Sequence, residues 1–323
     1  MVVITGGTGF IGSQLCGYLN QLGIEDVILV DKVSPQQRPL NCQQLRYRGF
    51  YSADQFLSEI MANGFQQNAQ SIRVVFHLGA NSSTTESNWS LLEQDNVFYS
   101  RAVWHFCVER KIPLIYASSA ATYGDGSLGY DDHIPPQQLR PLNLYGESKR
   151  VFDEFVLQQQ KTPPYFYGIK FFNVYGPGEF YKGDMASLVF KAFHQIRSTG
   201  YLRLFKSYRP EYGHGEQKRD FVYIKDVTRW LWELFQKKPP SGIYNMGFGT
   251  ARTWNDLARA IFMALERPIH IEYIEMPPYI RERYQYFTEA PMAHWFQQGL
   301  SSPHYSLEDG VSDYIRILAK TYN

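Results

Sequence analysis

The chain begins with a short apolar run that leads into a glycine-rich turn and then into an amphipathic stretch. Residues 2–5 are predicted to form a buried strand, and residues 11–22 have apolar residues at helical spacing. Gly6, Gly9 and Gly12 lie at the junction. Glycines at this spacing allow a tight turn, close approach of the backbone to a pyrophosphate, and close packing of helix on strand. The segment therefore predicts a dinucleotide site at the first strand of a parallel sheet.

An acidic residue follows at the distance that such a site requires. Asp31 comes 19 residues after Gly12, at the end of a second predicted strand over residues 27–30. This is close to the spacing of about 20 residues expected for a ribose-binding carboxylate. Asp31 would accept from a ribose 2′-hydroxyl, which favours NAD, whereas Lys32 and Arg38 could pair with a 2′-phosphate, which favours NADP. The charges alone leave both cofactors open.

Strand-like and helix-like segments alternate through the first half of the chain, which predicts parallel βαβ units. Further predicted strands cover residues 74–78, 114–117 and 167–172, and predicted helices cover residues 55–61, 91–110 and 145–160. We expect an α/β fold, with a Rossmann-like, doubly wound parallel sheet and a smaller C-terminal α/β substrate-binding lobe. The NAD(P)-binding domain would span residues 1–175, with residues 219–247 returning to it. The lobe would comprise residues 176–218 and 248–323.

Composition excludes several classes of partner. The chain has 32 Lys+Arg against 31 Asp+Glu, so it lacks the basic field of a nucleic-acid-binding protein. Cys16, Cys42 and Cys107 have no C-x-x-C spacing, so we predict neither a disulfide framework nor a metal site. The start of the chain has no basic leader and no apolar run near the roughly 20 residues that span a bilayer. We therefore expect a cytoplasmic protein without a membrane partner.

A tyrosine and a lysine stand four residues apart in a predicted helix. Tyr145 and Lys149 would point into the same space, because positions i and i+4 share a helix face. A nearby ammonium favours the phenolate, so we expect a lowered tyrosine pKa and a role as base towards an alcohol. Ser119 follows the fourth predicted strand, at the sheet edge where α/β proteins bind ligands, and could donate to an alkoxide or ketone oxygen.

Together, these segments resemble one large superfamily over nearly the whole chain. They read T-G-G-T-G-F-I-G from Thr5, S-S-A-A-T-Y-G from Ser118, Y-G-E-S-K from Tyr145 and N-V-Y-G-P from Asn173. The pattern is similar to that of the extended short-chain dehydrogenase/reductase superfamily. The resemblance implies a nicotinamide cofactor, Tyr145 as acid/base, Lys149 on the nicotinamide ribose and Ser119 on the reacting oxygen.

Four further segments carry a narrower resemblance. They begin at His77, Lys182, Lys218 and Arg283 and read H-L-G-A-N-S-S-T-T-E, K-G-D-M-A-S, K-R-D-F-V-Y and R-Y-Q-Y-F-T. They resemble, in the same order, segments of the ADP-L-glycero-D-manno-heptose 6-epimerase family. This implies epimerisation at C6 of ADP-D-glycero-D-manno-heptose through a 6-keto intermediate with bound NADP, in lipopolysaccharide core heptose biosynthesis. Lys182 would be a second base.

The same resemblance implies further contacts in the site. The cofactor-binding residues would be Gly6, Gly9, Phe10, Ile11, Gly12, Asp31, Lys32, Arg38, Leu78, Gly79, Ala80, Asn81, Ser82, Asn96, Tyr145, Lys149, Val174 and Lys182. The substrate-binding residues would be Ser82, Ser119, Asn173, Asp184, Lys191, Phe205, Arg219 and Tyr284. The chain departs from the family where Leu78 replaces a Glu, where Gly49 replaces an Asp, and in a longer loop over residues 206–218.

Two other functions stay open at this point. A UDP-hexose 4-epimerase would share the glycine turn and the Tyr145–Lys149 pair but would not require the Lys182 segment. A catalytically silent Rossmann domain that senses nucleotides would need the glycines but not Ser119, Tyr145 and Lys149. A 4,6-dehydratase is disfavoured, since Ser119 is followed by Ala-Ala-Thr and not by carboxylates. We also expect a homo-oligomer that acts on a small-molecule ADP-heptose.

Overall fold

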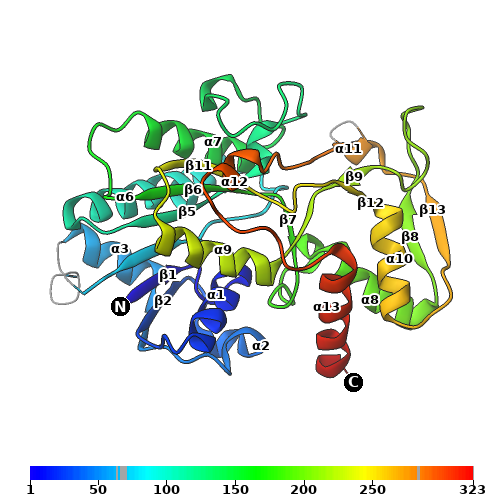
Figure 1. Ribbon diagram of the computed structural model, residues 1–323, viewed down its shortest axis with the longest axis horizontal. Helices are drawn as coiled ribbons and strands as arrows, with labels where there is room; N and C mark the ends of the chain where they lie inside the picture. Colours follow the sequence, from blue (N-terminus) through cyan, green and yellow to red (C-terminus); the bar gives the residue numbers. More distant parts are fainter. Residues whose placement is uncertain (63–64, 66–70, 282–283, 323) are drawn as a thin grey trace.

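The computed structural model describes residues 1–62, 65, 71–281 and 284–322. A seven-stranded sheet forms its centre, and every strand pairs in parallel with its neighbours (Figure 1). The order across the sheet is β11–β6–β5–β4–β1–β2–β3. The strands are β1 (Val2–Thr5), β2 (Val27–Asp31), β3 (Gly49–Ser52), β4 (Val74–His77), β5 (Leu114–Ser119), β6 (Phe166–Phe171) and β11 (Gly242–Met246).

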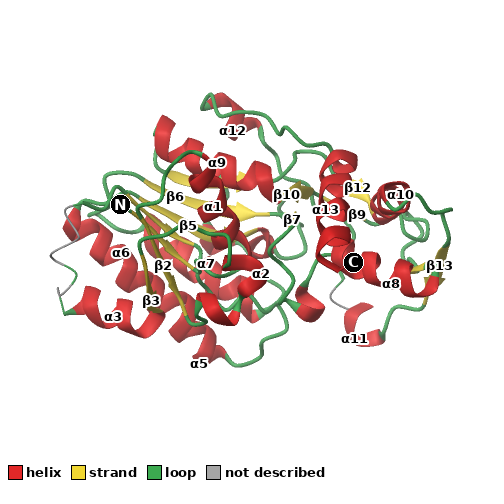
Figure 2. Ribbon diagram, turned by 90° about the horizontal axis from the view of Figure 1, so that it is seen from below, coloured by secondary structure: helices red, strands yellow, loops and turns green. Residues whose placement is uncertain are grey.

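Helices cover both faces of this sheet. On one face α1 (Phe10–Gln21) packs against α9 (Ile224–Lys237), and on the other face α3 (Ala53–Met61) packs against α6 (Tyr99–Arg110), with α7 (Leu144–Leu157) on the same side (Figure 2). Parallel strands buried on both faces read as continuous apolar runs, which is why the sequence revealed them. The predicted Rossmann-like, doubly wound sheet is confirmed.

The strand order reverses at β1. This strand pairs with β2 on one side and with β4 on the other, so the connections that leave β1 and β4 run to opposite faces of the sheet. Such a switch point opens a crevice at the carboxyl ends of the strands. The glycine turn after Thr5 and the loop after His77 therefore form the two sides of a preformed binding site.

A smaller lobe follows, at the right of Figure 1. It contains β8 (Leu202–Phe205), β9 (Lys218–Arg219), β12 (Arg252–Thr253), β13 (Ile271–Ile274), α8 (Leu188–Thr199), α10 (Trp254–Ala264) and α13 (Leu307–Tyr322). Helix α10 packs on α8 and α13, β8 pairs in parallel with β13, and β9 pairs in antiparallel with β12. The pair β7 (Asn173–Tyr175) and β10 (Phe221–Tyr223) lies between this lobe and the central sheet (Figure 2). The predicted C-terminal α/β lobe is confirmed.

Two predicted helices differ from the observed ones. The helix predicted over residues 91–110 starts earlier, with α5 (Trp89–Leu92), and passes through a π-helical turn, η2 (Glu93–Phe98), before α6. A further helix, which the apolar spacing predicts over residues 185–197, starts at Leu188, because Ser187 caps its first turn by accepting from the Phe190 N–H at 3.4 Å. Short elements complete the fold: η1 (Pro35–Gln37), α2 (Pro39–Cys42), η3 (Ala120–Tyr123), η4 (Pro136–Gln138), η5 (Gly183–Met185), α11 (Pro278–Arg281) and α12 (Ala293–Gln297).

None of the helices in the described ranges has both the length and the apolar character needed to cross a membrane.

Candidate active site

A cleft of about 1040 Å³ lies between the carboxyl edge of the central sheet and the smaller lobe. Its walls come from the loops after β1 and β4, from β5 and from α7 on one side, and from α8, β8 and α10 on the other. Most of the predicted site residues line it. These are Gly6, Gly9, Phe10, Ile11, Gly12, Asp31, Arg38, Leu78, Gly79, Ala80, Asn81, Ser82, Ser119, Tyr145, Lys149, Asn173, Val174, Lys182, Lys191, Phe205 and Tyr284.

The glycine turn has no room for side chains. A Cβ on Gly12 would lie 2.1 Å from the Gly6 carbonyl oxygen, and a Cβ on Gly6 would lie 2.7 Å from the Gly79 nitrogen in the loop after β4. Gly6 also has a φ of 66°, which few other residues adopt. The turn delivers the chain to α1 with the Phe10 N–H at the helix start, where backbone donors and the helix dipole suit phosphates. These features fit the diphosphate of a dinucleotide.

At the predicted ribose site, the carboxylate of Asp31 lies beside the guanidinium cation of Arg38. The Asp31 carboxylate accepts from the Thr8 N–H at 3.1 Å and from the Val33 N–H at 3.3 Å. The Arg38 guanidinium lies 3.9 Å from the same carboxylate. Lys32 is placed differently, because its ammonium pairs with Asp95 at 2.6 Å and its side chain is 60% exposed.

Tyr181 reaches into the glycine turn, and no sequence pattern predicted it. Its hydroxyl accepts from the Phe10 N–H at 2.8 Å, and its ring lies 3.8 Å below the Arg38 guanidinium. Tyr181 therefore takes up the backbone donor that the turn presents to a phosphate. The loop between β7 and α8 brings it there, an approach that depends on the tertiary fold.

The structure brings the three predicted groups of β5 and α7 together. Tyr145 and Lys149 lie one helical turn apart in α7, and the Tyr145 hydroxyl is hydrogen-bonded to Ser119 at the end of β5. The Lys149 ammonium donates to the Ala117 carbonyl at 2.8 Å. The arrangement can hold a hydroxyl-bearing carbon close to a phenol and a serine hydroxyl.

Burial controls the protonation of these groups. It raises the pKa of Tyr145, and the hydrogen bond from Ser119 opposes this only in part. Burial also lowers the pKa of Lys149 to about 8, against the attraction of Asp153. The lowered tyrosine pKa expected from the Tyr145–Lys149 spacing is thus not found in the protein without ligands, because burial and the nearby Asp153 carboxylate outweigh the hydrogen bond from Ser119.

Asn96 holds the loop after β4 against α7. It is buried in the π-helical turn, accepts from the Asn81 N–H at 2.8 Å, and donates to the Asn81 carbonyl and to Ser148 Oγ, both at 2.9 Å. Its side chain thereby positions Asn81, which lines the cleft, and does not line the cleft itself.

Lys182 enters the cleft from the loop that precedes η5. Its Nζ lies 5.3 Å from the centroid of the Phe10 ring, at the start of α1. Burial lowers the pKa of this ammonium, against the attraction of Glu179. A lowered pKa makes it easier for a lysine to give up its proton and so to take part in proton transfer. Tyr145 and Lys182 therefore bring two proton-carrying groups to one cleft from separate parts of the chain.

Aromatic rings enclose a buried cation behind the substrate side of the cleft. The Arg219 guanidinium lies 5.8 Å from the Trp254 ring centroid and 5.2 Å from that of Tyr284, and it donates to the Gln285 carbonyl. The Trp254 indole donates to the Tyr284 hydroxyl at 2.9 Å. Arg283, which opens this family-like segment, lies outside the described residues. Arg219 thus contacts Tyr284, which lines the cleft, but does not line the cleft itself.

The chain is similar to known proteins over almost its whole length. The profile of the NAD dependent epimerase/dehydratase family matches residues 2–247. The chain belongs to this family. An ADP-L-glycero-D-manno-heptose-6-epimerase of Fusobacterium nucleatum subsp. nucleatum is 42% identical over 98% of this chain and 97% of its own length. A protein of that name from Nitratidesulfovibrio vulgaris, strain Hildenborough, is 43% identical, again over 98% and 97%.

Solved structures agree with this placement in the epimerase family. The crystal structure of Helicobacter pylori ADP-L-glycero-D-manno-heptose-6-epimerase matches with a TM-score of 0.81 at 28% identity, over 98% of this chain and 96% of that one. The resemblance predicted from the sequence is confirmed, because relatives of that name match over almost their full length. The protein is therefore an enzyme of the epimerase type.

Four residues that the family resemblance suggested lie outside the cleft lining: Lys32, Asn96, Asp184 and Arg219. Asp184 is exposed, and its backbone carbonyl accepts from Lys191 at 3.2 Å. Conversely, Gln195 of α8 and Arg203 of β8 line the cleft although no motif contains them. Only the position of Arg203 could have indicated its place in the cleft, since Arg203 shares a strand face with the predicted Phe205. No such pattern indicated Gln195.

Proposed function

We propose that the enzyme interconverts ADP-D-glycero-D-manno-heptose and ADP-L-glycero-D-manno-heptose by inverting the configuration at C6. The observation that carries the proposal is the shared cleft, in which a dinucleotide cradle, the Tyr145–Ser119 pair and Lys182 come together. The curated relatives bear the name of this reaction at 42% and 43% identity.

The proposed mechanism needs proton transfer on two faces of the reacting carbon. The nicotinamide, when bound, supplies the chemistry that takes the hydride from C6 and gives it back. Tyr145 accepts the proton of the C6 hydroxyl, and Ser119 donates a hydrogen bond to the ketone oxygen that results. Once the 6-keto group has turned, Lys182 would supply the proton to the new hydroxyl on the other face. Lys149 keeps its positive charge beside Tyr145 and offers donors to the cofactor ribose.

The substrate is tested by two parallel incubations. UDP-hexose epimerases share this architecture, but the UDP-N-acetylglucosamine 4-epimerase of Methanobrevibacter ruminantium is only 20% identical, a likeness that shows the fold alone. We expect the enzyme to equilibrate the two ADP-heptose epimers and to leave UDP-galactose unchanged, as measured by NMR of the sugar protons. Conversion of UDP-galactose alone would contradict the proposed substrate.

We infer that the resident cofactor is NADP and not NAD. Arg38 lines the cleft beside Asp31 and can neutralise this carboxylate while it faces a 2′-phosphate, and Lys32 lies next in the chain. The test is to denature the purified enzyme and identify the released nucleotide by mass spectrometry. Release of NADP is expected, with weaker retention after Arg38→Gln. Release of NAD alone, with no binding of added NADP, would overturn the inference.

We also propose that the enzyme is cytoplasmic and homo-oligomeric. Cys16, Cys42 and Cys107 are free in the described structure, as suits a reducing compartment. Light scattering of the purified enzyme at micromolar concentration would give the oligomeric state, and a monomer would contradict it.

A further inference from the structure

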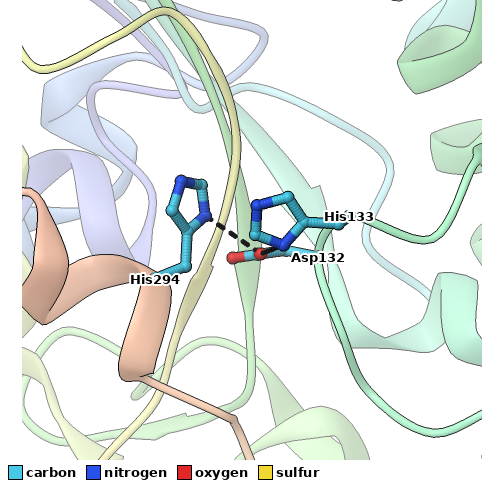
Figure 3. Close-up of side chains that lie close together, drawn as sticks. All are labelled: Asp132, His133 and His294. Atoms are coloured by element: carbon cyan, nitrogen blue, oxygen red, sulfur yellow. Dashed lines mark hydrogen bonds and ion pairs between the residues drawn. The ribbon is translucent and has the colours of Figure 1, made fainter.

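Three side chains that the proposed reaction does not use meet outside the cleft. Asp132 and His133 lie in the loop between η3 and η4, and His294 lies in α12 (Figure 3). Asp132 Oδ1 is 3.2 Å from His133 Nδ1 and 3.0 Å from His294 Nδ1. The sequence predicted no metal site, because 162 residues separate Asp132 from His294 and only the fold joins them.

The separations between these atoms suit a shared metal ion. In a tetrahedral site with bonds of about 2.0–2.2 Å, neighbouring ligand atoms lie about 3.3–3.6 Å apart. The two measured separations, 3.2 and 3.0 Å, are slightly shorter than this, and the three potential ligand atoms lie within 4.8 Å of one another. Small rotations of the imidazole rings are therefore enough to receive an ion between them.

A supporting shell orients two of the three groups. The Asp132 side chain is only 3% exposed, and its second oxygen accepts from the Asn245 N–H at 2.8 Å. The His294 ring stacks on Tyr244, with centroids 4.4 Å apart and planes at 13°. Metal ligands in proteins are commonly held in this way by hydrogen bonds and packing around them. The cluster thus has a fixed half that exists before any ion binds.

The third group provides access and a further donor. The His133 side chain is 65% exposed, and its Nδ1 is 2.9 Å from the carboxylate of Asp131. The open side lets an ion enter from solvent, and Asp131 or water can complete four ligands. Two carboxylates would balance the charge of a divalent cation. Two imidazoles favour zinc and related transition metals over Mg²⁺ and Ca²⁺, which prefer oxygen ligands.

We propose that Asp132, His133 and His294 bind one divalent transition-metal ion of the Zn²⁺ class, outside the cleft. The ion would tie the loop that follows Ser119 to α12, near the segment that carries Tyr284. Hydrogen bonds already hold this loop in place, because Tyr130 donates to the Phe287 carbonyl and the Asn245 side chain of β11 donates to the Tyr130 carbonyl. The proposal concerns a structural clip and does not depend on the reaction proposed above.

The site is tested by metal titration of the full-length enzyme after treatment with chelator. We expect one equivalent of Zn²⁺ to bind in competition with a chromophoric chelator, and His133→Gln and His294→Gln each to weaken this binding by at least about tenfold. His304→Gln is the matched control, because it removes an exposed imidazole outside the cluster. Equal affinity in the wild type and both cluster variants, or no saturable binding, would overturn the proposal.

A second measurement does not depend on variants that fold. Wild-type enzyme loaded with Co²⁺ should show paramagnetically shifted NMR signals from two imidazole N–H groups, because coordination through Nδ1 leaves the proton on Nε2. The melting temperature should rise by about 3–6 °C at a hundredfold excess of Zn²⁺ over its dissociation constant. The absence of shifted imidazole signals in a sample that contains one equivalent of Co²⁺ would contradict the site.

Discussion

The pKa values of individual residues in the cleft depend more on burial than on the spacing of these residues in the sequence. The pattern of Tyr145 and Lys149 predicted that one would sit beside the other, and α7 places them so. The spacing did not predict the pKa values of these two residues. Lys149 donates to the Ala117 carbonyl, and burial removes both Tyr145 and Lys149 from water. A sequence carries the identity and spacing of such groups, whereas their hydration depends on every element that packs over them.

The phenol of Tyr145 is the first group to test. Tyr145→Phe should lower turnover by about 10²–10⁴-fold, because it removes the group that carries the proton of the C6 hydroxyl. Cofactor content and circular dichroism should stay at wild-type values. Tyr322→Phe, which removes a phenol hydroxyl outside the cleft, should be as active as the wild type. Near-normal turnover by Tyr145→Phe would exclude this residue as the acid/base.

Removal of the Tyr181 hydroxyl should strengthen cofactor binding, whereas removal of the Tyr145 hydroxyl should reduce turnover. Its hydroxyl competes with phosphate for the Phe10 N–H. Since a neutral hydrogen bond contributes about 1 kcal/mol, Tyr181→Phe should bind cofactor about fivefold more tightly. Fluorescence titration of cofactor-free enzyme would measure this, with Tyr322→Phe again as the control. Weaker binding by Tyr181→Phe would show that the hydroxyl contacts the bound cofactor and does not compete with it.

Lys182 distinguishes a mechanism with two proton carriers from one in which Tyr145 serves both faces. Lys182→Met should block exchange between the two ADP-heptose epimers but still permit oxidation or reduction of one of them, seen as half-reactions with a 6-aldehyde analogue. Lys161→Met, at an exposed lysine, is the matched control. Full epimerisation by Lys182→Met would refute the role of Lys182.

At the scale of elements, apolar runs predicted the buried strands, whereas some elements with weaker sequence patterns were not predicted. The prediction for β1 was correct to the residue, those for β2 and β4 differed by one residue at one end, and that for β6 was shifted by one residue at both ends. β3 was not predicted, because Gly49–Ser52 is an edge strand without a strong apolar run. α13 was also not predicted, although Leu307, Val311 and Leu318 give it an apolar face. The π-helical turn has no sequence signal, since it depends on tertiary contacts of Asn96.

The end of β4 carries a buried histidine that makes stability depend on pH. His77 bridges Thr5 Oγ1 at 2.7 Å and Ser100 Oγ at 2.8 Å, and burial, helped by Lys149, lowers its pKa from 6.5 to about 3. Between these two pH values the unfolded chain binds a proton that the folded chain does not. His77 therefore contributes its full stability above about pH 6.5, and this contribution is lost as the pH falls towards 3.

Urea unfolding at a series of pH values tests this. The shift corresponds to about 3–5 kcal/mol over the full pH range. His77→Asn should lower stability at pH 7 and flatten its decline between about pH 6.5 and pH 4, whereas His304→Gln should keep the wild-type slope. An unchanged slope in His77→Asn would mean that other groups control the acid unfolding.

At the scale of the whole molecule, one continuous apolar core joins the sheet to the smaller lobe. It runs from Val2 and Leu29 in the sheet to Leu204, Ala258 and Leu318 in the lobe. The cleft lies where these two parts meet, so its walls combine short motifs from both. Motifs predicted most of the residues that line the cleft, because the family resemblance was carried by such short segments. Contributions from Tyr181, Trp254 and Arg203 depended on how distant segments pack.

The central claim is that inversion at C6 occurs by oxidation and reduction with one resident cofactor. We would incubate the enzyme with ADP-D-glycero-D-manno-heptose deuterated at C6, in ordinary water with excess unlabelled NADPH, and analyse the L-glycero product by mass spectrometry and NMR. The account predicts that the product keeps its deuterium at C6, because the same hydride leaves and returns while one cofactor stays bound. Replacement of that deuterium by hydrogen from solvent or from the added NADPH would contradict it.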